Sequence, residues 1–274
     1  RMTTVRANGI DLYYEIHGSG EPAVLIQGLG ANITGWDLQL EPLSRQYQLI
    51  AFDNRGAGRS EKPDEAYSIH QMADDTAALM EELGIQTAHV FGMSMGGMIA
   101  QEMYHRHRAR VRSLILAGTM AGGPMATFPD MNVFQQFVSN GATSMEEAIA
   151  EGLKLFYSEE FLAKNQDWLI QRSLKNMSLM APPHALQKQV IAVMGFNAHG
   201  LLSGIKVPTL VMGATDDQIV PFANQQQIAT RIPEARFVPF EGAGHGFLTE
   251  RAVAVNSAVL DFWGKHGTYS PPAK

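Results

Sequence analysis

Six short runs of apolar, β-forming residues recur along the chain, at residues 24–26, 48–52, 88–93, 111–117, 207–212 and 236–240. Most of these runs are continuous rather than alternating, which is typical of strands covered on both faces of a parallel sheet. Helical patterns lie between the later runs, so the sequence predicts an open, right-handed, doubly wound α/β sheet. Ahead of the first run, residues 3–7 and 12–17 are expected to form a hairpin with Asn8-Gly9 as its turn.

Helices are expected to cover this sheet. The first spans residues 69–83, because Ser68 and Gln71 have the spacing of a capping box and Gly84 is suited to end a helix. Two more helices are expected at residues 95–107 and 248–264. Residues 268–274 are expected to be a frayed tail.

The alternation of strands and helices breaks over residues 119–205. This segment has a helical pattern with a capping signal at Ser144 and Glu147, a break at Pro182-Pro183, and seven of the fifteen methionines. It is either a helical insertion with a methionine-filled core or a cap that roofs an apolar site. We favour a cap, because the segment leaves the sheet where ligand-binding loops of such folds gather. The expected organisation is a core domain in two parts, residues 1–119 and 205–274, with a helical cap over residues 120–204.

Composition excludes several classes of protein. A net charge of −6 without a basic run argues against a nucleic-acid or anionic-membrane partner. The absence of cysteine excludes disulfides, thiol nucleophiles and thiolate metal sites. No apolar stretch approaches the roughly 18 residues of a membrane span, and the first ten residues lack the apolar region of a signal peptide. We therefore expect a soluble, cytoplasmic protein.

The sequence HVFGMSMGGM, at residues 89–98, carries the strongest chemical signal. Ser94 stands between the end of a β run and the start of a helical pattern. Gly92 and Gly96 leave room for a turn so sharp that the serine is strained, with its hydroxyl raised above the sheet. This strand–turn–helix context favours a nucleophile over a structural glycine-rich turn.

A serine hydroxyl is a poor nucleophile unless a neighbouring base takes its proton. Among the nine histidines, His245 lies in the loop EGAGHGF between the last β run and the last helix. That loop can bring its imidazole over the edge of the sheet where Ser94 is expected. His89 lies within a strand and is expected to be structural. His105 and His107 point to different faces of a helix, so they are not expected to bind a metal.

The stretch GATDDQIVP, at residues 213–221, supplies the carboxylate that such a base needs. Successive residues in extended chain point to opposite sides, so only one of Asp216 and Asp217 can face His245. A proton-sharing pair is not expected, because the base needs an ionised partner. The chain order is then Ser, Asp, His.

On these motifs the chain resembles the α/β-hydrolase superfamily from near its N-terminus to about Lys265. The matching stretches are residues 27–30 (QGLG), residues 53–60 (DNRGAGRS), the Ser94 turn, the aspartate-bearing strand end and Gly-His245-Gly. The resemblance implies an eight-stranded, mostly parallel sheet with a helical cap inserted after strand six. It also implies a Ser-His-Asp mechanism that uses no cofactor and no metal.

By the same resemblance, Ser94 is the nucleophile and His245 the general base, and the backbone N–H groups of Leu29 and Met95 form the oxyanion hole. Rigid amides suit that role, because they stabilise the negative oxygen of a tetrahedral intermediate without reorganising. Gln27 stands where the family usually has histidine, and its amide is expected to hold the loop by hydrogen bonds.

Two spacings compete for the acid. Counting from Gly213 selects Asp216, whereas counting back from Pro221 selects Asp217. Aligning Ala214 with the family's strand-end glycine makes both counts agree on Asp217. We therefore expect Asp217 to orient the base and Asp216 to be a turn-forming neighbour.

The expected activity is hydrolysis of a small carboxylic ester or lactone with an apolar acyl or alkyl part. A serine rather than an aspartate at the turn argues against dehalogenase and epoxide hydrolase chemistry. The residue after Leu29 is not a proline, so the sequence gives no support to a perhydrolase. Two alternatives stay open: carbon–carbon bond hydrolysis of a β-diketone, and a ligand-binding receptor on the same fold. Arg55 and Arg59 are expected to be structural, bracing the floor of the site.

Overall fold

The computed structural model describes residues 3–130, 132–133 and 144–267. Its sheet has eight strands in the order β1-β2-β4-β3-β5-β6-β7-β8. β1 and β2 run antiparallel to their neighbours, and the pairs from β4 to β8 are parallel. The predicted eight-stranded, mostly parallel sheet is confirmed.

The strands are β1 (Thr3–Ala7), β2 (Ile10–His17), β3 (Glu21–Ile26), β4 (Tyr47–Phe52), β5 (Ala88–Met93), β6 (Val111–Ala117), β7 (Thr209–Ala214) and β8 (Arg236–Phe240). The bounds predicted for β5, β6 and β8 are confirmed. β7 begins and ends two residues later than predicted, because Pro208 has no N–H to donate to a neighbouring strand. The hairpin turn is also confirmed, with φ of 48° at Asn8 and 80° at Gly9.

The helices include α1 (Asp37–Ser44), α2 (Ile69–Glu82), α3 (Met95–His107), α5 (Met145–Phe156), α6 (Glu159–Lys175), α7 (Pro183–Met194), α8 (Ala223–Arg231), α9 (Phe247–Glu250) and α10 (Ala252–His266). The single helix expected over 248–264 is wrong: Arg251, with φ −119° and ψ 32°, separates α9 from α10. The sequence did not predict α1 and α8, which have 8 and 9 residues and are too short for a clear periodic signal.

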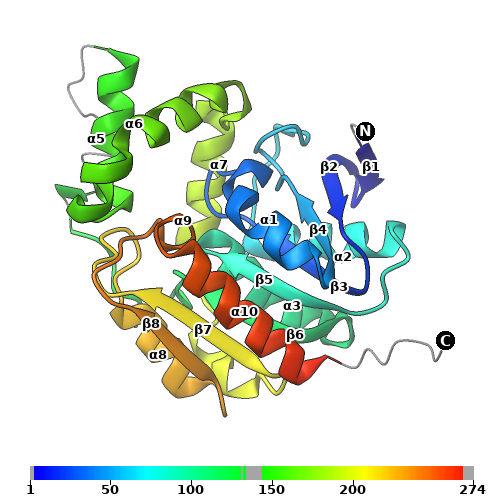
Figure 1. Ribbon diagram of the computed structural model, residues 1–274. Helices are drawn as coiled ribbons and strands as arrows, with labels where there is room; N and C mark the ends of the chain where they lie inside the picture. The colour runs from blue at the N-terminus through cyan, green and yellow to red at the C-terminus, as the bar shows by residue number, and fades with distance from the viewer. Residues whose placement is uncertain (1–2, 131, 134–143, 268–274) are drawn as a thin grey trace.

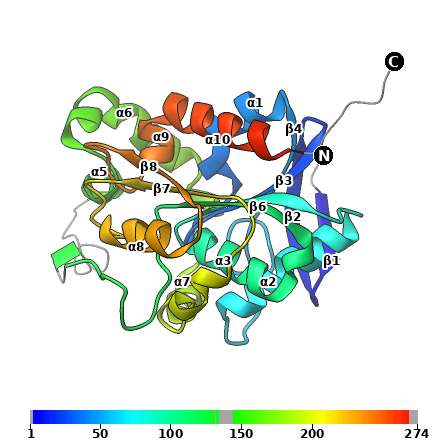
Figure 2. The same ribbon diagram turned by 90° about the horizontal axis from the view of Figure 1, so that it is seen from below.

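Helices cover both faces of the sheet, as the continuous apolar runs predicted. In β3, Ala23 and Leu25 pack into the core that includes side chains of α1 and α10. Val24 and Ile26 pack into the opposite core, with α2, α3 and α8. Figure 2 shows the resulting three layers, with α1 and α10 above the sheet and α2, α3 and α8 below it.

The helices α5, α6 and α7 form a cap that lies beyond one end of the sheet (Figure 1). The Ser144 hydroxyl accepts the Glu147 N–H at 3.1 Å, and α7 begins at Pro183, so both signals read in this segment are confirmed. Within the described residues of this segment, no methionine-filled core is found. The apolar cluster between α5 and α6 contains Leu153, Leu162 and Leu169. Four methionines of this segment are exposed, namely Met125, Met145, Met180 and Met194.

No helix in the described part of the chain is long and apolar enough to cross a membrane. The tail predicted at residues 268–274 lies outside the described residues. The division into a core of residues 1–119 and 205–274 and a cap of residues 120–204 stays a prediction.

Candidate active site

Ser94 occupies the turn between β5 and α3 in a conformation that L-residues rarely adopt, with φ 56° and ψ −121°. Its neighbours hold this strained backbone in place. The Ser94 N–H donates to Ala117 O at 2.8 Å, and the Thr119 hydroxyl donates to Ser94 O at 2.7 Å. The last residue of β6 and the segment directly after it therefore hold both the N–H and the carbonyl of Ser94.

The two glycines that flank Ser94 make the turn possible. A Cβ atom at Gly92 would overlap the carbonyl of Gly96, and a Cβ atom at Gly96 would overlap the carbonyl of Ile26. A larger residue at Gly92 would push α3 away from β5, and one at Gly96 would push α3 away from the end of β3. The close packing predicted for these glycines is confirmed.

The structure brings His245 and Asp217 together. His245 Nδ1 lies 2.7 Å from Asp217 Oδ2, and both residues are 5% exposed. The other carboxylate oxygen accepts the N–H groups of Ile219 and Val220, at 2.9 and 2.8 Å. Three donors thus hold the carboxylate against the imidazole.

Asp216 lies elsewhere, although it is the adjacent residue. Its side chain is exposed, and its carboxylate accepts a hydrogen bond from the Thr215 hydroxyl at 2.9 Å. Its backbone N–H donates to Ala243 O at 3.1 Å, which fastens this turn to the loop that carries His245. The two aspartates therefore have different environments, and only Asp217 faces His245, although both follow the end of β7 in a turn rather than in extended chain.

Ser94, Asp217 and His245 follow β5, β7 and β8, so all three lie at the carboxyl edge of the parallel sheet. Among the described residues, no hydrogen bond joins the Ser94 hydroxyl to His245. Such catalytic hydrogen bonds often tighten only when substrate binds. The cap reaches this edge, because the Phe156 ring lies 5.9 Å from the His245 ring.

The loop after β3 packs directly against the serine. A Cβ atom at Gly28 would lie 2.9 Å from Ser94 Cβ. The Gly28 N–H donates to Gln27 Oε1 at 3.1 Å, so the expectation that this glutamine holds the loop is confirmed. In the part of the chain that is described, the Leu29 and Met95 N–H groups donate to no protein acceptor.

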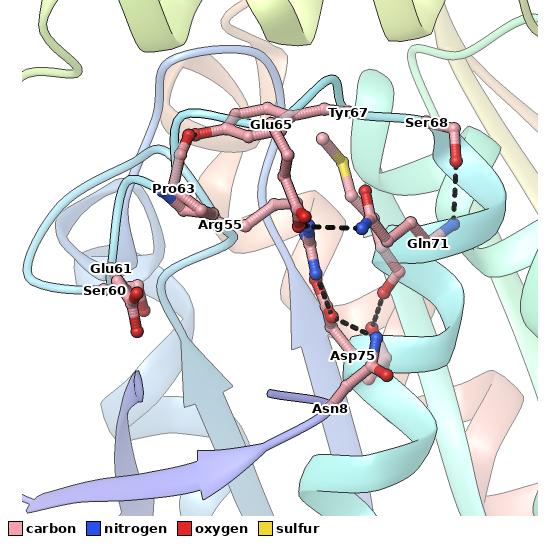
Figure 3. Close-up of polar contacts among 12 residues, drawn as sticks. Asn8, Arg55, Ser60, Glu61, Pro63, Glu65, Tyr67, Ser68, Gln71 and Asp75 are labelled. Carbon is pink, nitrogen blue, oxygen red and sulfur yellow. Dashed lines mark hydrogen bonds and ion pairs between the residues drawn. The ribbon is translucent and has the colours of Figure 1, made fainter. Parts of the chain in front are cut away.

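Arg55 is a structural residue, as predicted. Its side chain is 1% exposed, and its guanidinium pairs with Asp75 at 2.5 Å and with Glu65 at 2.9 Å (Figure 3). Asn8 adds a further hydrogen bond to Asp75 at 2.7 Å. Gln71 donates its amide to Glu65 at 3.0 Å, while its N–H caps α2 through the Ser68 hydroxyl.

Arg59 is also engaged within the protein, as predicted. Its guanidinium lies 4.5 Å from the centroid of the Tyr13 ring. Its N–H donates to Asp53 Oδ2 at 2.8 Å, and Ile33 N donates to Oδ1 at 2.7 Å. Burial raises the pKa of Asp53, although these two N–H groups oppose the shift. The residues 53–60 thus form a turn that is braced by contacts within the protein.

His89 lies in β5 and is structural, as predicted. Its Nδ1 is 2.7 Å from the Ser113 hydroxyl, and its ring stacks on Trp263 at 5.3 Å. Burial lowers the pKa of His89 to about 4, and His266 contributes in the same direction. The nearby Glu21 carboxylate, 3.4 Å from Nε2, is already paired with Arg112. Within the described residues, no group of three or more His, Cys, Asp or Glu side chains could hold a metal ion.

Two residues near the site were not singled out from the sequence. Glu250 is 7% exposed and accepts hydrogen bonds from the Ser158 hydroxyl and N–H, and from Gly244 N. Gln189 in α7 contacts the loop after β3. Neither residue lies in a motif, and the contacts of Glu250 with Ser158 and of Gln189 with Gly30 join residues 92 and 159 positions apart, so spacing carried no signal for them.

The pattern of the family described as the alpha/beta hydrolase fold matches residues 22–252 of this chain. The chain belongs to the α/β-hydrolase fold family. The proposed carbamate hydrolase RutD of Azorhizobium caulinodans is 30% identical to it over 96% of this chain and 99% of its own length.

Solved structures of similar proteins agree with this family. The enol-lactonase from Burkholderia xenovorans LB400 has a TM-score of 0.82 at 28% identity, over 96% of this chain and 100% of its own. Est816, described as an N-acyl homoserine lactone degrading enzyme, has a TM-score of 0.81 at 27% identity, over 95% and 100%. These relatives support hydrolase chemistry on this fold.

Proposed function

We propose that the protein is a serine hydrolase that cleaves a carboxylic ester or lactone through an acyl-enzyme on Ser94. One observation carries this proposal: a strained serine and a buried His245–Asp217 pair at 2.7 Å lie at one edge of the same parallel sheet. Relatives whose names describe lactone-degrading enzymes support the class of substrate.

In the first half-reaction, Ser94 Oγ attacks the carbonyl carbon while His245 Nε2 takes its proton. Asp217 accepts the Nδ1–H of His245, which fixes the tautomer and stabilises the imidazolium. The tetrahedral intermediate carries a negative oxygen, and the free N–H groups of Leu29 and Met95 are the proposed donors to it.

The intermediate then collapses, and the leaving alkoxide takes the proton from His245. With a lactone this alkoxide stays attached to the acyl group. Water attacks the acyl-enzyme in the second half-reaction and gives its proton to His245. The second tetrahedral intermediate then collapses, His245 returns the proton to Ser94 Oγ, and the acid or hydroxy acid is released. No cofactor is required by these steps, and the expected substrate is small and apolar.

The proposal is tested with p-nitrophenyl acetate and butyrate, followed by a panel of acyl esters, lactones, carbamates and β-diketones. We expect turnover of esters or lactones, and labelling by a fluorophosphonate that maps to Ser94. Ser94→Ala should abolish both, with a loss in kcat of about 10⁵-fold or more.

Other outcomes favour the alternatives. Turnover confined to β-diketones would favour carbon–carbon bond hydrolysis. Slow, single-turnover labelling without sustained hydrolysis would favour a receptor. The absence of turnover and of labelling at Ser94 would refute the proposal.

A further inference from the structure

The four backbone N–H groups of residues 28–31 differ in their hydrogen-bond acceptors. Gly28 donates to the Gln27 side chain at 3.1 Å, and Ala31 donates to Gly28 O at 3.2 Å. Gly30 donates to Oε1 of Gln189 at 2.8 Å. Within the described residues, Leu29 is the member of this set whose N–H has no protein acceptor. The loop therefore directs one N–H away from the protein's own acceptors while using the others to hold its shape.

Gln189 comes from the cap, not from the sheet core. It lies in α7, and its side chain is fully buried. Its Nε2 donates to Arg55 O at 2.8 Å, so one amide satisfies two backbone groups of the core. A buried amide with both ends paired is rigid, because losing either hydrogen bond would leave a desolvated polar group.

The two residues that the Gln189 amide joins, Arg55 and Gly30, are themselves held in place. Arg55 is fixed by its buried ion pair with Asp75 and by a second ion pair with the exposed Glu65, both drawn in Figure 3. At the other end, Gly30 has a φ of 66°, and a Cβ atom there would lie 2.9 Å from Leu186 in α7. Helix α7 therefore packs closely on the loop and places an acceptor at its Gly30 N–H.

We infer that Gln189 is a positioning residue, through which the cap sets the peptide that presents the Leu29 N–H to the reacting oxygen. The inference rests on the proposed function. Oxyanion stabilisation depends on donors that are already oriented, and deleting one such donor outright costs about 10²- to 10³-fold in kcat. Loosening a donor should cost less than deleting it.

The experiment compares Gln189→Met, which keeps the size of the side chain, with Gln189→Glu, which keeps an acceptor for Gly30. The matched control is Lys188→Met, on the same helix. Lys188 also joins the cap to the core, through Asp64 at 2.8 Å and Pro63 O at 3.2 Å, but it does not touch the loop.

We expect Gln189→Met to lower kcat about tenfold while KM stays within about twofold, since the lost interaction acts on the transition state. Affinity for an alkyl trifluoromethyl ketone should fall by the same factor as kcat/KM, because Ser94 addition leaves an oxyanion on that inhibitor. Gln189→Glu should recover part of the loss. Lys188→Met should stay within about twofold of the wild type in both constants.

Hydrogen exchange gives a readout that does not need turnover. The amide of Gly30 should exchange faster in Gln189→Met and at the wild-type rate in Lys188→Met. Unchanged exchange, a rise in KM without a fall in kcat, or an equal loss in Lys188→Met would overturn the inference. If Ser94-dependent turnover is absent from the wild type, the proposed function fails and this inference fails with it. Turnover that needs Ser94 but is indifferent to Gln189 overturns only the inference.

Discussion

The sheet core and the cap are stabilised by different kinds of contact. In the core, backbone hydrogen bonds join the eight strands, and apolar side chains are buried on both faces of the sheet. The cap has a small leucine cluster of its own, and among the described cap helices only α7 adds buried apolar residues, Ala185 and Ala192, to a core cluster. Polar contacts also join the cap to the core, through Gln189, Arg172, Lys188 and the Glu250–Ser158 pair. Under the proposed function, this difference assigns the reacting residues to the core and their fine positioning to the cap.

The largest expected effect lies entirely in the core. Asp217→Asn should lower kcat about 10⁴-fold, because His245 loses the carboxylate that fixes its tautomer. Asp216→Asn, the matched control one residue away, should stay within about twofold, since that side chain is exposed. Steady-state kinetics on the best ester decides this, and the reverse order of effects would make the assignment of the acid wrong.

The second prediction concerns the pH dependence of core stability. The pKa of His89 is about 4 in the folded chain against 6.5 for a free side chain, so between these values the unfolded chain binds the extra proton. The free energy of unfolding should therefore fall as pH drops from 6.5 to 4, by up to about 3 kcal/mol from this group. Urea titrations at several pH values across this window give the free energy of unfolding as a function of pH. The slope of that plot should be shallower for His89→Gln than for the wild type. Parallel slopes would contradict the prediction.

A smaller effect is expected at the junction of core and cap. Glu250→Gln removes the charged acceptor shared by Ser158 and Gly244, which should cost about 1–3 kcal/mol in the free energy of unfolding. It should also lower kcat, because Gly244 adjoins His245. Glu241→Gln, an exposed carboxylate in the same loop, is the control. Equal denaturation midpoints for the two variants would show that Glu250 does not stabilise the junction.

The smallest effect is expected at the surface of that junction. Arg172 pairs with Asp37 at 2.6 and 2.8 Å, and the Asp37 side chain is 42% exposed. Because water and salt screen such a pair, Arg172→Met should cost less than about 1 kcal/mol. Denaturation at low and high salt measures it. A cost above that of Glu250→Gln would mean that surface charge, rather than buried contacts, holds the cap.

The sequence predicted those features that local physics decides. The bounds of β5, β6 and β8 followed from continuous apolar runs, and the turn at Ser94 followed from glycines whose Cβ atoms would overlap a backbone carbonyl. The alternation of side chains along extended chain indicated that only one of Asp216 and Asp217 can face His245, whereas the choice of Asp217 came from aligning Ala214 with the family's strand-end glycine.

The sequence did not predict features that depend on tertiary contacts. Gln189 meets Gly30 and Arg55 across 159 and 134 residues, and no spacing rule links such positions. The break at Arg251 and the exposure of the cap methionines were missed for a related reason. A helical or apolar pattern shows that a face must be buried somewhere, but it does not identify the partner that buries it.

The order of the elements along the chain has a consequence for synthesis. Chains emerge from the ribosome N-terminal end first, so β5, β6 and the Ser94 turn are complete before the cap, whereas Asp217 and His245 follow it. A nascent chain that ends in the cap contains Ser94 but lacks the histidine that would activate it. Under the proposed function, an incompletely synthesised chain does not hydrolyse esters. Hydrolysis begins only when the last strand joins the sheet, after the segment that covers the site has been made.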